Sequence, residues 1–231
     1  SVSNSAAGDP GRDVESRVDF EARRRASVAL NAINSVDSIR AAVLAVKGVV
    51  DARVVDNPLG TVATVGGVDL LPHSLFVCAS GGNSSNIAKA IWGKKPPGCD
   101  YNGTTSVVVT DDAYADPKPS YTVKFTRPAH IRTYFAISIA SLPSNPSNIE
   151  DLISSAVLAA FNGQDGGSRA GIGSTIYASR FYASVLAISS SPIEILSLFV
   201  GRTASPTSTA LAINNNEIPT LSSGDILVSI V

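Results

Sequence analysis

The chain has 231 residues, with 18 Lys and Arg against 19 Asp and Glu, and a formal net charge of −1. A chain so close to neutral lacks the positive charge that strong non-specific nucleic-acid binding requires, so we expect no nucleic-acid partner. Its length suits one large domain or two small ones, and it buries enough apolar surface to fold without disulfides or metals.

Charged residues are sparse, at 16% of the chain, and Ala, Ser, Val and Ile take their place. A surface poor in charge suits burial against partner subunits, although an ordinary domain from a Ser- and Ala-rich source gives the same composition. The two cysteines, Cys78 and Cys99, are too few and too far apart for a zinc motif, and two separate thiols are favoured over a disulfide. No apolar stretch is long enough to span a membrane.

The N-terminal part predicts a loose leader followed by two helices. Residues 1–13 are small and polar, which is typical of a flexible leader or of the tail of a missing domain. Because the chain begins with Ser and contains no Met, we expect a processed, trimmed or cut N-terminus. A helix is predicted over 14–32 and another over 38–47, with Asp37 as the N-cap of the second and Gly48 as its stop.

Alternating apolar and polar residues then predict short strands separated by Gly- and Pro-containing turns. The Gly81-Gly82-Asn83 turn leads into a predicted helix over 84–91, whose N-terminus we expect Ser or Asn to cap. The strands expected in this part of the chain cover residues 49–55, 73–79, 104–110 and 121–126.

Arg127-Pro128 predicts a boundary, because proline restricts the preceding residue to extended conformations. Beyond it, Ser147 and Glu150 form a capping-box pattern that opens a helix reaching about Asn162. The Gly-rich segment after this helix, 163–173, is expected to be mobile or to form turns, and 174–188 can be helix or strand. The remaining predicted strands cover 131–140, 193–200, and a closing pair over 210–214 and 225–231.

Strands and helices without a regular βαβ rhythm predict the α+β class. We expect two small mixed α/β subdomains, each with a few-stranded sheet and packed helices. The predicted division is a flexible leader over 1–13, an N-terminal α+β subdomain over 14–127, and a C-terminal α+β subdomain over 128–231.

No motif in the chain has the spacing of a catalytic, cofactor or metal site. The Gly81-Gly82-Asn83 turn has the shape that binds anions at a helix N-terminus, but it lacks the Lys-Ser/Thr of a phosphate loop and the third Gly of a dinucleotide fingerprint. The Asp111-Asp112 loop lacks the alternating oxygen ligands of a calcium site and predicts a solvated turn. His73 and His130 sit in no known catalytic pattern. We therefore expect no catalytic, cofactor-binding or metal-binding residues.

A basic triplet stands in the first predicted helix. Arg23, Arg24 and Arg25 follow Glu21, and Glu21 with Arg25 forms an i,i+4 pair worth a few tenths of a kcal/mol when exposed. These residues suit either a solvated helix face or an ion-pair cluster between subunits, since Arg binds carboxylates through two nitrogens. We take Glu21, Arg23, Arg24 and Arg25 as a candidate subunit interface.

Several of these features, in this order, resemble the baseplate J-like family, whose members are wedge proteins of contractile phage tails. The likeness covers most of residues 13–231, and each piece is weak while the ordered set is fairly specific. One departure is that family members usually carry a further N-terminal part. The matching pieces are Asp13-Val-Glu15-Ser16, Glu21 with Arg23-Arg24-Arg25, Val46-Lys-Gly48-Val49 with Asp56-Asn57, Gly81-Gly82 before Ile87-Ala88, the spaced Gly98 and Gly103, Phe125 with Arg127-Pro128, and Asn216 to Val228.

The resemblance implies a structural component of a phage or prophage baseplate wedge, not an enzyme. It implies assembly in the bacterial cytoplasm into the tail baseplate, with neighbouring copies and other wedge proteins as partners around the central hub. The ring rearranges when the sheath contracts, and the candidate hinges are Arg127-Pro128 and the loop around Gly166 and Gly167. Two alternatives stay open: a hydrolase-type enzyme, and a tail-fibre-like module that binds a surface or carbohydrate.

Overall fold

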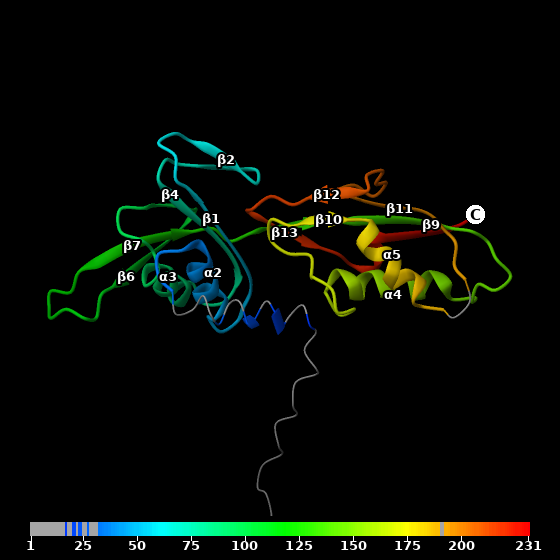
Figure 1. Cartoon of the computed structure of the whole chain (residues 1–231), viewed down its shortest axis with the longest axis horizontal. Helices are drawn as coiled ribbons and strands as arrows, with labels where there is room; N and C mark the ends of the chain where they lie inside the picture. Colours follow the sequence, from blue (N-terminus) through cyan, green and yellow to red (C-terminus); the bar gives the residue numbers. More distant parts are fainter. Residues whose placement is uncertain (1–16, 18–19, 22, 25–26, 28–31, 190–191) are drawn as a thin grey trace, which may run out of the picture.

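The fold belongs to the α+β class and is built from several small sheets with helices packed on them (Figure 1). The computed structural model describes residues 17, 20–21, 23–24, 27, 32–189 and 192–231. Two lobes lie side by side in this structure, one formed by the first half of the chain and the other by the second. None of the helices in the described residues is long and apolar enough to cross a membrane.

The N-terminal lobe contains three small sheets, ordered β1-β4-β5, β2-β3 and β6-β7, and two helices that pack against β1, β6 and β7. Strand β4 lies at its centre, antiparallel to β1 and parallel to β5. Its elements are α2 (Val36–Leu44), β1 (Val49–Asn57), β2 (Ala63–Val65), β3 (Val68–Leu70), β4 (Ser74–Gly81), α3 (Ser84–Trp92), β5 (Asp100–Asn102), β6 (Thr105–Thr110) and β7 (Ser120–Phe125).

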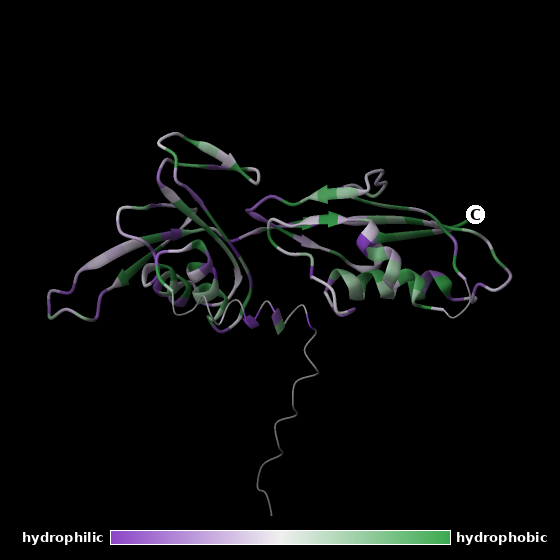
Figure 2. Ribbon diagram, in the orientation of Figure 1, coloured by the Kyte–Doolittle hydropathy of each residue, from purple (hydrophilic) through white to green (hydrophobic). Residues whose placement is uncertain are grey.

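The C-terminal lobe is a three-stranded sheet of order β11-β9-β14 with helices α4 and α5 on one face, extended by the pairs β10-β12 and β13-β8. Figure 2 shows that α4 and the strands beside it are largely hydrophobic. The elements are β8 (Ala129–Arg132), β9 (Tyr134–Ile139), α4 (Ile149–Phe161), β10 (Thr175–Tyr177), α5 (Ser179–Leu186), β11 (Ile195–Gly201), β12 (Ala210–Ala212), β13 (Glu217–Thr220), the 3-10 turn η1 (Ser223–Asp225) and β14 (Ile226–Ile230).

Each lobe has its own hydrophobic core, which follows from the burial of alternate strand residues. In β9 the pattern places Phe135, Ile137 and Ile139 against the helices, and all three are fully buried. Residues of the N-terminal core fall between Ile39 and Phe125, and those of the C-terminal core between Phe135 and Ile226. The two cores therefore lie on opposite sides of Arg127-Pro128.

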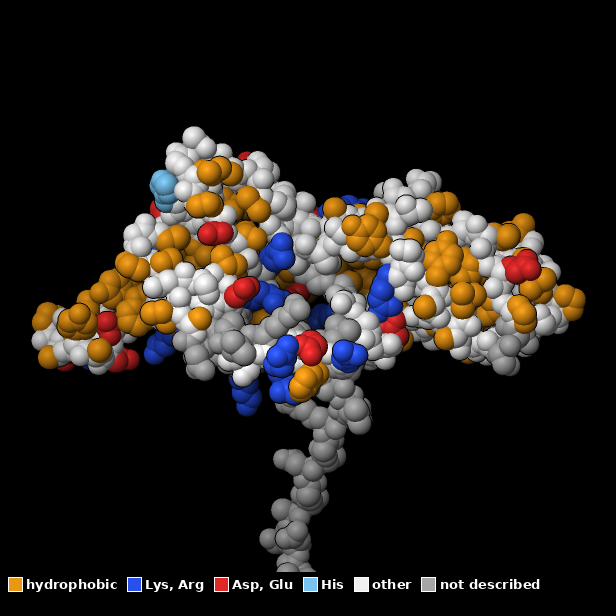
Figure 3. Space-filling view, viewed as in Figure 1, with side chains coloured by type: hydrophobic (Ala, Val, Ile, Leu, Met, Phe, Trp, Pro, Cys, Tyr) orange, Lys and Arg blue, Asp and Glu red, His pale blue; other side chains and the backbone are white. Residues whose placement is uncertain are grey.

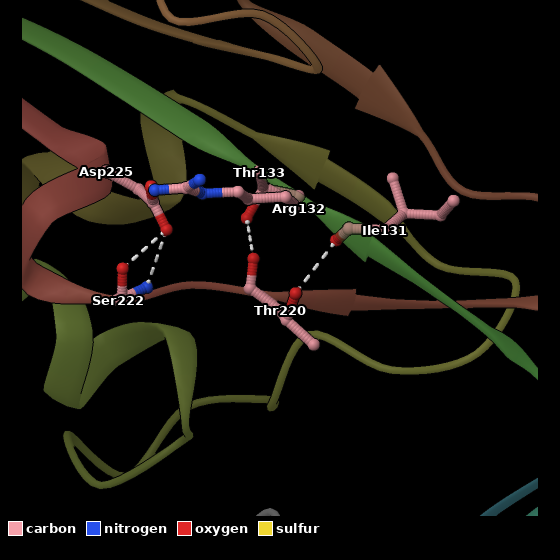
Figure 4. Close-up of polar contacts among 6 residues, drawn as sticks. All are labelled: Ile131, Arg132, Thr133, Thr220, Ser222 and Asp225. Atoms are coloured by element: carbon pink, nitrogen blue, oxygen red, sulfur yellow. Dashed lines mark hydrogen bonds and ion pairs between the residues drawn. The ribbon is translucent and has the colours of Figure 1, made fainter.

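A long parallel ladder runs through the C-terminal lobe, formed by β8 and β9 on one side and β13 and β14 on the other. Thr133 separates β8 from β9, and η1 separates β13 from β14. A polar cluster bridges this interruption (Figure 4): the Thr133 hydroxyl donates to the Thr220 carbonyl at 2.8 Å, and the Thr220 hydroxyl donates to the Ile131 carbonyl at 3.2 Å. The cluster keeps β13 and β14 in register with their partners.

Asp225 is the buried charge of this cluster. Its side chain is 2% exposed, and it accepts hydrogen bonds from Arg132 Nε at 2.6 Å and from the Ser222 hydroxyl at 2.6 Å (Figure 4). Hydrogen bonding from Arg132 lowers the pKa of Asp225, opposed by burial and aided by Ser222. A buried carboxylate is tolerated here because each of its oxygens has a donor.

Three predicted features are wrong in detail. The N-cap of α2 is Ser35, because its hydroxyl accepts from the Ser38 N–H, and Asp37 lies in the first turn. Helix α4 has Asn148 at its N-cap without a side-chain hydrogen bond, so Ser147 and Glu150 form no capping box. The closing strands do not pair with each other, since β12 pairs with β10 and β14 pairs with β9.

Two other segments answer questions that the sequence left open. The predicted strand over 131–140 divides into β8 and β9 at Thr133. Residues 174–188 supply both alternatives, with strand β10 first and helix α5 after it. The cap of α3 is Asn83, whose side chain accepts from the backbone N–H groups of Ser85 and Asn86, which confirms the prediction of a capped helix at this turn.

Candidate functional site

The two lobes meet at a seam, which we define as the contacts of Asp51, Arg53 and the β2–β3 hairpin with the loops around Ile172 and Asn215. Asn215 is 2% exposed and lies at the centre of the seam. Its side-chain oxygen accepts from Arg53 Nε at 3.0 Å, and its side-chain nitrogen donates to the Val65 carbonyl at 2.9 Å. One side chain of the C-terminal lobe thus binds two separate elements of the N-terminal lobe.

Backbone groups reinforce the seam on both sides of Asn215. The Asn215 N–H donates to the Gly66 carbonyl at 2.8 Å, and the Ile172 N–H donates to the Asp51 carboxylate at 2.7 Å. Gly66 has a φ of +55°, and a Cβ on it would lie 2.3 Å from the Asn215 side chain. A glycine at this position therefore serves both the left-handed backbone and the close approach of the asparagine.

A small apolar cluster lies under these hydrogen bonds and draws on both lobes. The N-terminal lobe contributes Leu70, Phe76 and Cys78, and the C-terminal lobe contributes Ile172 and Ile218. Burying a Leu, Ile or Phe side chain contributes about 1.5–3 kcal/mol to stability relative to leaving it exposed. The seam therefore combines a dry centre with satisfied polar groups, which is the composition of a stable interface.

The turn that carries Asn215 is held from its other side by an ion pair. Arg202 donates to both carboxylate oxygens of Glu217, at 3.0 and 2.7 Å, and Glu217 also accepts from the Asn214 N–H at 3.0 Å. Hydrogen bonding from Arg202 lowers the pKa of Glu217. The planar two-nitrogen geometry of Arg fixes the turn more firmly than a single contact would.

Arg127, a candidate hinge residue, is held by the N-terminal lobe. Its guanidinium donates to the carbonyls of Ala79, Gly81 and Gly82 and to the Ser84 hydroxyl, the last at 2.9 Å. These bonds fasten the segment before Pro128 to the end of β4 and the start of α3. They also fill the carbonyl side of the Gly81-Gly82 turn.

Gly166 and Gly167 belong to a loop that is anchored by Asp165. This carboxylate accepts from both terminal nitrogens of Arg180, from the Ser184 hydroxyl at 2.7 Å and from the Gly167 N–H at 3.1 Å. Hydrogen bonding from Arg180 is the largest influence and holds the pKa of Asp165 well below its usual range. A hinge motion at either segment would have to break the hydrogen bonds of Arg127 or of Asp165, and the hinge assignment stays a prediction.

The anchored loop gives a testable pH dependence. Because the pKa of Asp165 is lowered in the folded chain, its contribution to the free energy of unfolding is present above about pH 4, the pKa of an unfolded Asp. That contribution is lost as the pH falls below this value toward the lower folded pKa. We expect Asp165→Asn to cost about 1–3 kcal/mol at pH 7 and clearly less at pH 2, where part of the contribution is already lost, as measured by urea unfolding at each pH.

The control for this experiment is Asp112→Asn. Asp112 bonds Lys118 at 3.1 Å, and that bond lowers its pKa, but the side chain is 69% exposed, so solvent screens the pair. Its substitution is expected to leave the pH profile unchanged. If both substitutions reduced the pH dependence of the free energy of unfolding equally, the role given to Asp165 would be wrong.

The candidate subunit interface is only partly described. Arg24 donates to Glu21 at 3.1 Å, an i,i+3 pair with both side chains largely exposed, and the guanidinium of Arg23 lies 5.3 Å from the centre of the Phe20 ring. Arg25 lies outside the described residues. Glu21 thus has a partner one position earlier than the predicted Arg25.

Cys78, the cysteine that a catalytic dyad would use, is poorly suited to chemistry. Cys78 is buried, and burial raises the pKa of its thiol to about 12, which removes it as a nucleophile. Both cysteines are free thiols. The described residues contain no group of three or more His, Cys, Asp or Glu side chains that could hold a metal.

Sequence reasoning missed the seam. Asn215 is 162 positions from Arg53 and 150 from Val65, and isolated polar residues at such distances carry no local pattern. The run of three asparagines at 214–216 was the available signal. Comparisons with protein-family models and with curated proteins find no match for this chain.

Proposed function

We propose that the chain is a structural component of a contractile-tail baseplate wedge, in a phage or a prophage, and that it has no enzymatic role. In this proposal it assembles in the bacterial cytoplasm and joins neighbouring copies and other wedge proteins in the ring around the hub. The proposal rests on the ordered motifs quoted above, since the comparisons give it no support.

The observation that carries the proposal furthest is the seam around Asn215. A wedge protein transmits a displacement between neighbours, and two loosely linked lobes would absorb that displacement. Here polar bonds and a shared apolar cluster hold the lobes together. We infer that the seam limits motion between the lobes, so that most of the rearrangement on contraction occurs at the contacts between subunits.

The surface supports a role in assembly. Large hydrophobic side chains lie exposed on both lobes, including Val50, Val62, Val108, Leu196 and Leu227, each more than half exposed. Figure 3 shows hydrophobic side chains spread over one face of both lobes. Single exposed hydrophobics are normal, but their abundance on a surface poor in charge favours burial against other subunits.

Neither alternative gains from the geometry. A hydrolase built on Cys78 would need a reactive thiol, and this thiol is buried with a raised pKa. A carbohydrate-binding module would need aromatic rings gathered in a groove. Tyr114 and Tyr177 are more than half exposed, but they come from separate lobes, and Trp92 stacks on Tyr121 at 5.6 Å.

Co-expression tests the proposal. The chain is produced with proteins encoded beside its gene, purified through a tag on one of those proteins, and weighed by native mass spectrometry. We expect a stable complex with a tail component at defined stoichiometry. Recovery of the chain without any tail component, from cells that contain all of them, would contradict the proposal.

A further inference from the structure

Strand β14 is an edge strand of the C-terminal sheet among the residues that the structure describes. It is the last strand in the order β11-β9-β14, and it pairs in parallel with β9 on its other side. The Val231 N–H donates to the Ile139 carbonyl of β9, and the Val231 carbonyl accepts from the N–H of Ser141, just beyond β9. Because a parallel strand directs alternate residues to each side, the backbone groups of Val228 and Ile230 point away from β9.

In the described part of the chain, this edge lacks three features that usually protect an edge strand. The sequence Ile226 to Ile230 is Ile-Leu-Val-Ser-Ile, without charge, proline or bulge. Ile230 is 43% exposed and Val228 is partly buried. An uncharged edge of this kind presents unpaired N–H and C=O groups to any strand that can lie beside it.

We propose that β14 pairs with β14 of a second copy of this chain, antiparallel and centred on Val228. The pattern of the strand is self-complementary in this register, because Ile226 then faces Ile230 of the other copy and Val228 faces Val228. These residues share the helix face with Phe135, Ile137 and Ile139 of β9, so apolar side chains meet on the side that the helices already cover.

The backbone groups fit the same register. Val228 of each copy exchanges N–H to C=O hydrogen bonds with its counterpart, and the Ile230 N–H donates to the Ile226 carbonyl across the interface. The Ile226 N–H takes no part, because it already donates to Ser223 within η1. A two-fold axis perpendicular to the sheet keeps the helices of both copies on one face and joins two three-stranded sheets into one continuous sheet.

A partner with a charged or proline-containing strand fits less well, since this edge offers no charge to pair with it. The buried Asp225 and its bonds to Ser222 and Arg132 fix where β14 begins, so the position of the edge is set before a second copy arrives. The inference goes beyond the proposed function because it needs no tail component.

Sedimentation velocity of the purified full chain, from low micromolar to several hundred micromolar, tests the pairing. We expect a monomer–dimer equilibrium that Val228→Pro weakens by about tenfold or more through the loss of edge hydrogen bonds. Proline suits this position because the Val228 N–H points away from β9, so the bonds within the copy remain. Ile230→Lys is expected to weaken the dimer similarly, with circular dichroism confirming that both variants fold.

The matched control is Leu196→Lys, at a residue 57% exposed on β11, the opposite edge strand. It should leave the dimer intact. A Val228→Cys substitution in a Cys99→Ser background should also cross-link copies under mild oxidation, whereas Leu196→Cys should not. A chain that stays monomeric at every concentration, or a dimer equally weakened at Leu196, overturns the proposal. The absence of this dimer would not affect the co-expression test of the wedge role. A failed co-expression test would likewise leave the dimer test unaffected.

Discussion

Replacing Phe135 by alanine is expected to lower the free energy of unfolding by about 3–5 kcal/mol, the loss typical of a buried phenylalanine. Phe135 is fully buried at the centre of the C-terminal core. Its ring packs edge-on against Phe181 at 4.7 Å and Phe161 at 6.4 Å, so the substitution removes contacts to both helices at once. Urea unfolding followed by circular dichroism measures the loss.

The control is Leu186→Ala on helix α5, whose side chain is 47% exposed. Its cost should stay below about 1 kcal/mol, because an exposed leucine has little burial to lose. Similar losses for both variants would mean that the three phenylalanines do not form the centre of this core.

Replacing Asn215 by alanine is expected to cost about 2–4 kcal/mol, although it removes little volume. The substitution leaves Arg53 Nε and the Val65 carbonyl without their partner in a partly buried seam, and each unsatisfied group costs about 1–3 kcal/mol. We also expect one unfolding transition for the unmodified chain and two for Asn215→Ala, because the lobes lose the side-chain bonds of Asn215. Differential scanning calorimetry resolves the two transitions.

Two comparisons sharpen this experiment. Asn148→Ala, at an exposed asparagine with no side-chain cap bond, should cost almost nothing. In a double-mutant cycle, Arg53→Ala and Asn215→Ala should be strongly non-additive, because the two side chains share a hydrogen bond. Additive losses and a single transition in Asn215→Ala would remove the seam as the link between lobes.

The elements that could be predicted from the sequence are those with local signals. The Gly81-Gly82-Asn83 turn precedes α3, because glycine adopts left-handed conformations and asparagine caps a helix N-terminus. Gly48 has a φ of +84° and lies in the turn before β1, but the prediction that it stops the helix is wrong, since α2 ends at Leu44 with Ala45 as its C-cap. The α+β class was predicted from the order of strands and helices that such local signals separate. Where two local signals competed, as between Ser35 and Asp37 at the start of α2, the hydroxyl with the better geometry forms the cap.

Long-range pairings could not be predicted in the same way. The strands predicted over 210–214 and 225–231 were expected to pair because they lie close together in the sequence. In the structure β14 is parallel to β9, and Ile226 pairs with Phe135, which lies 91 positions earlier. Parallel pairing depends on contacts across the whole lobe, which the sequence does not mark. The seam could not be predicted for the same reason, since Asn215 and Arg53 are 162 positions apart in the sequence and meet only in the folded chain.

Electron cryo-microscopy of tail particles from the cell that encodes this chain tests its role most directly. The account predicts several copies in the baseplate around the hub, each with both lobes in the arrangement described here, before and after sheath contraction. Particles whose baseplates lack the chain, while it accumulates free in the same cells, would contradict the account.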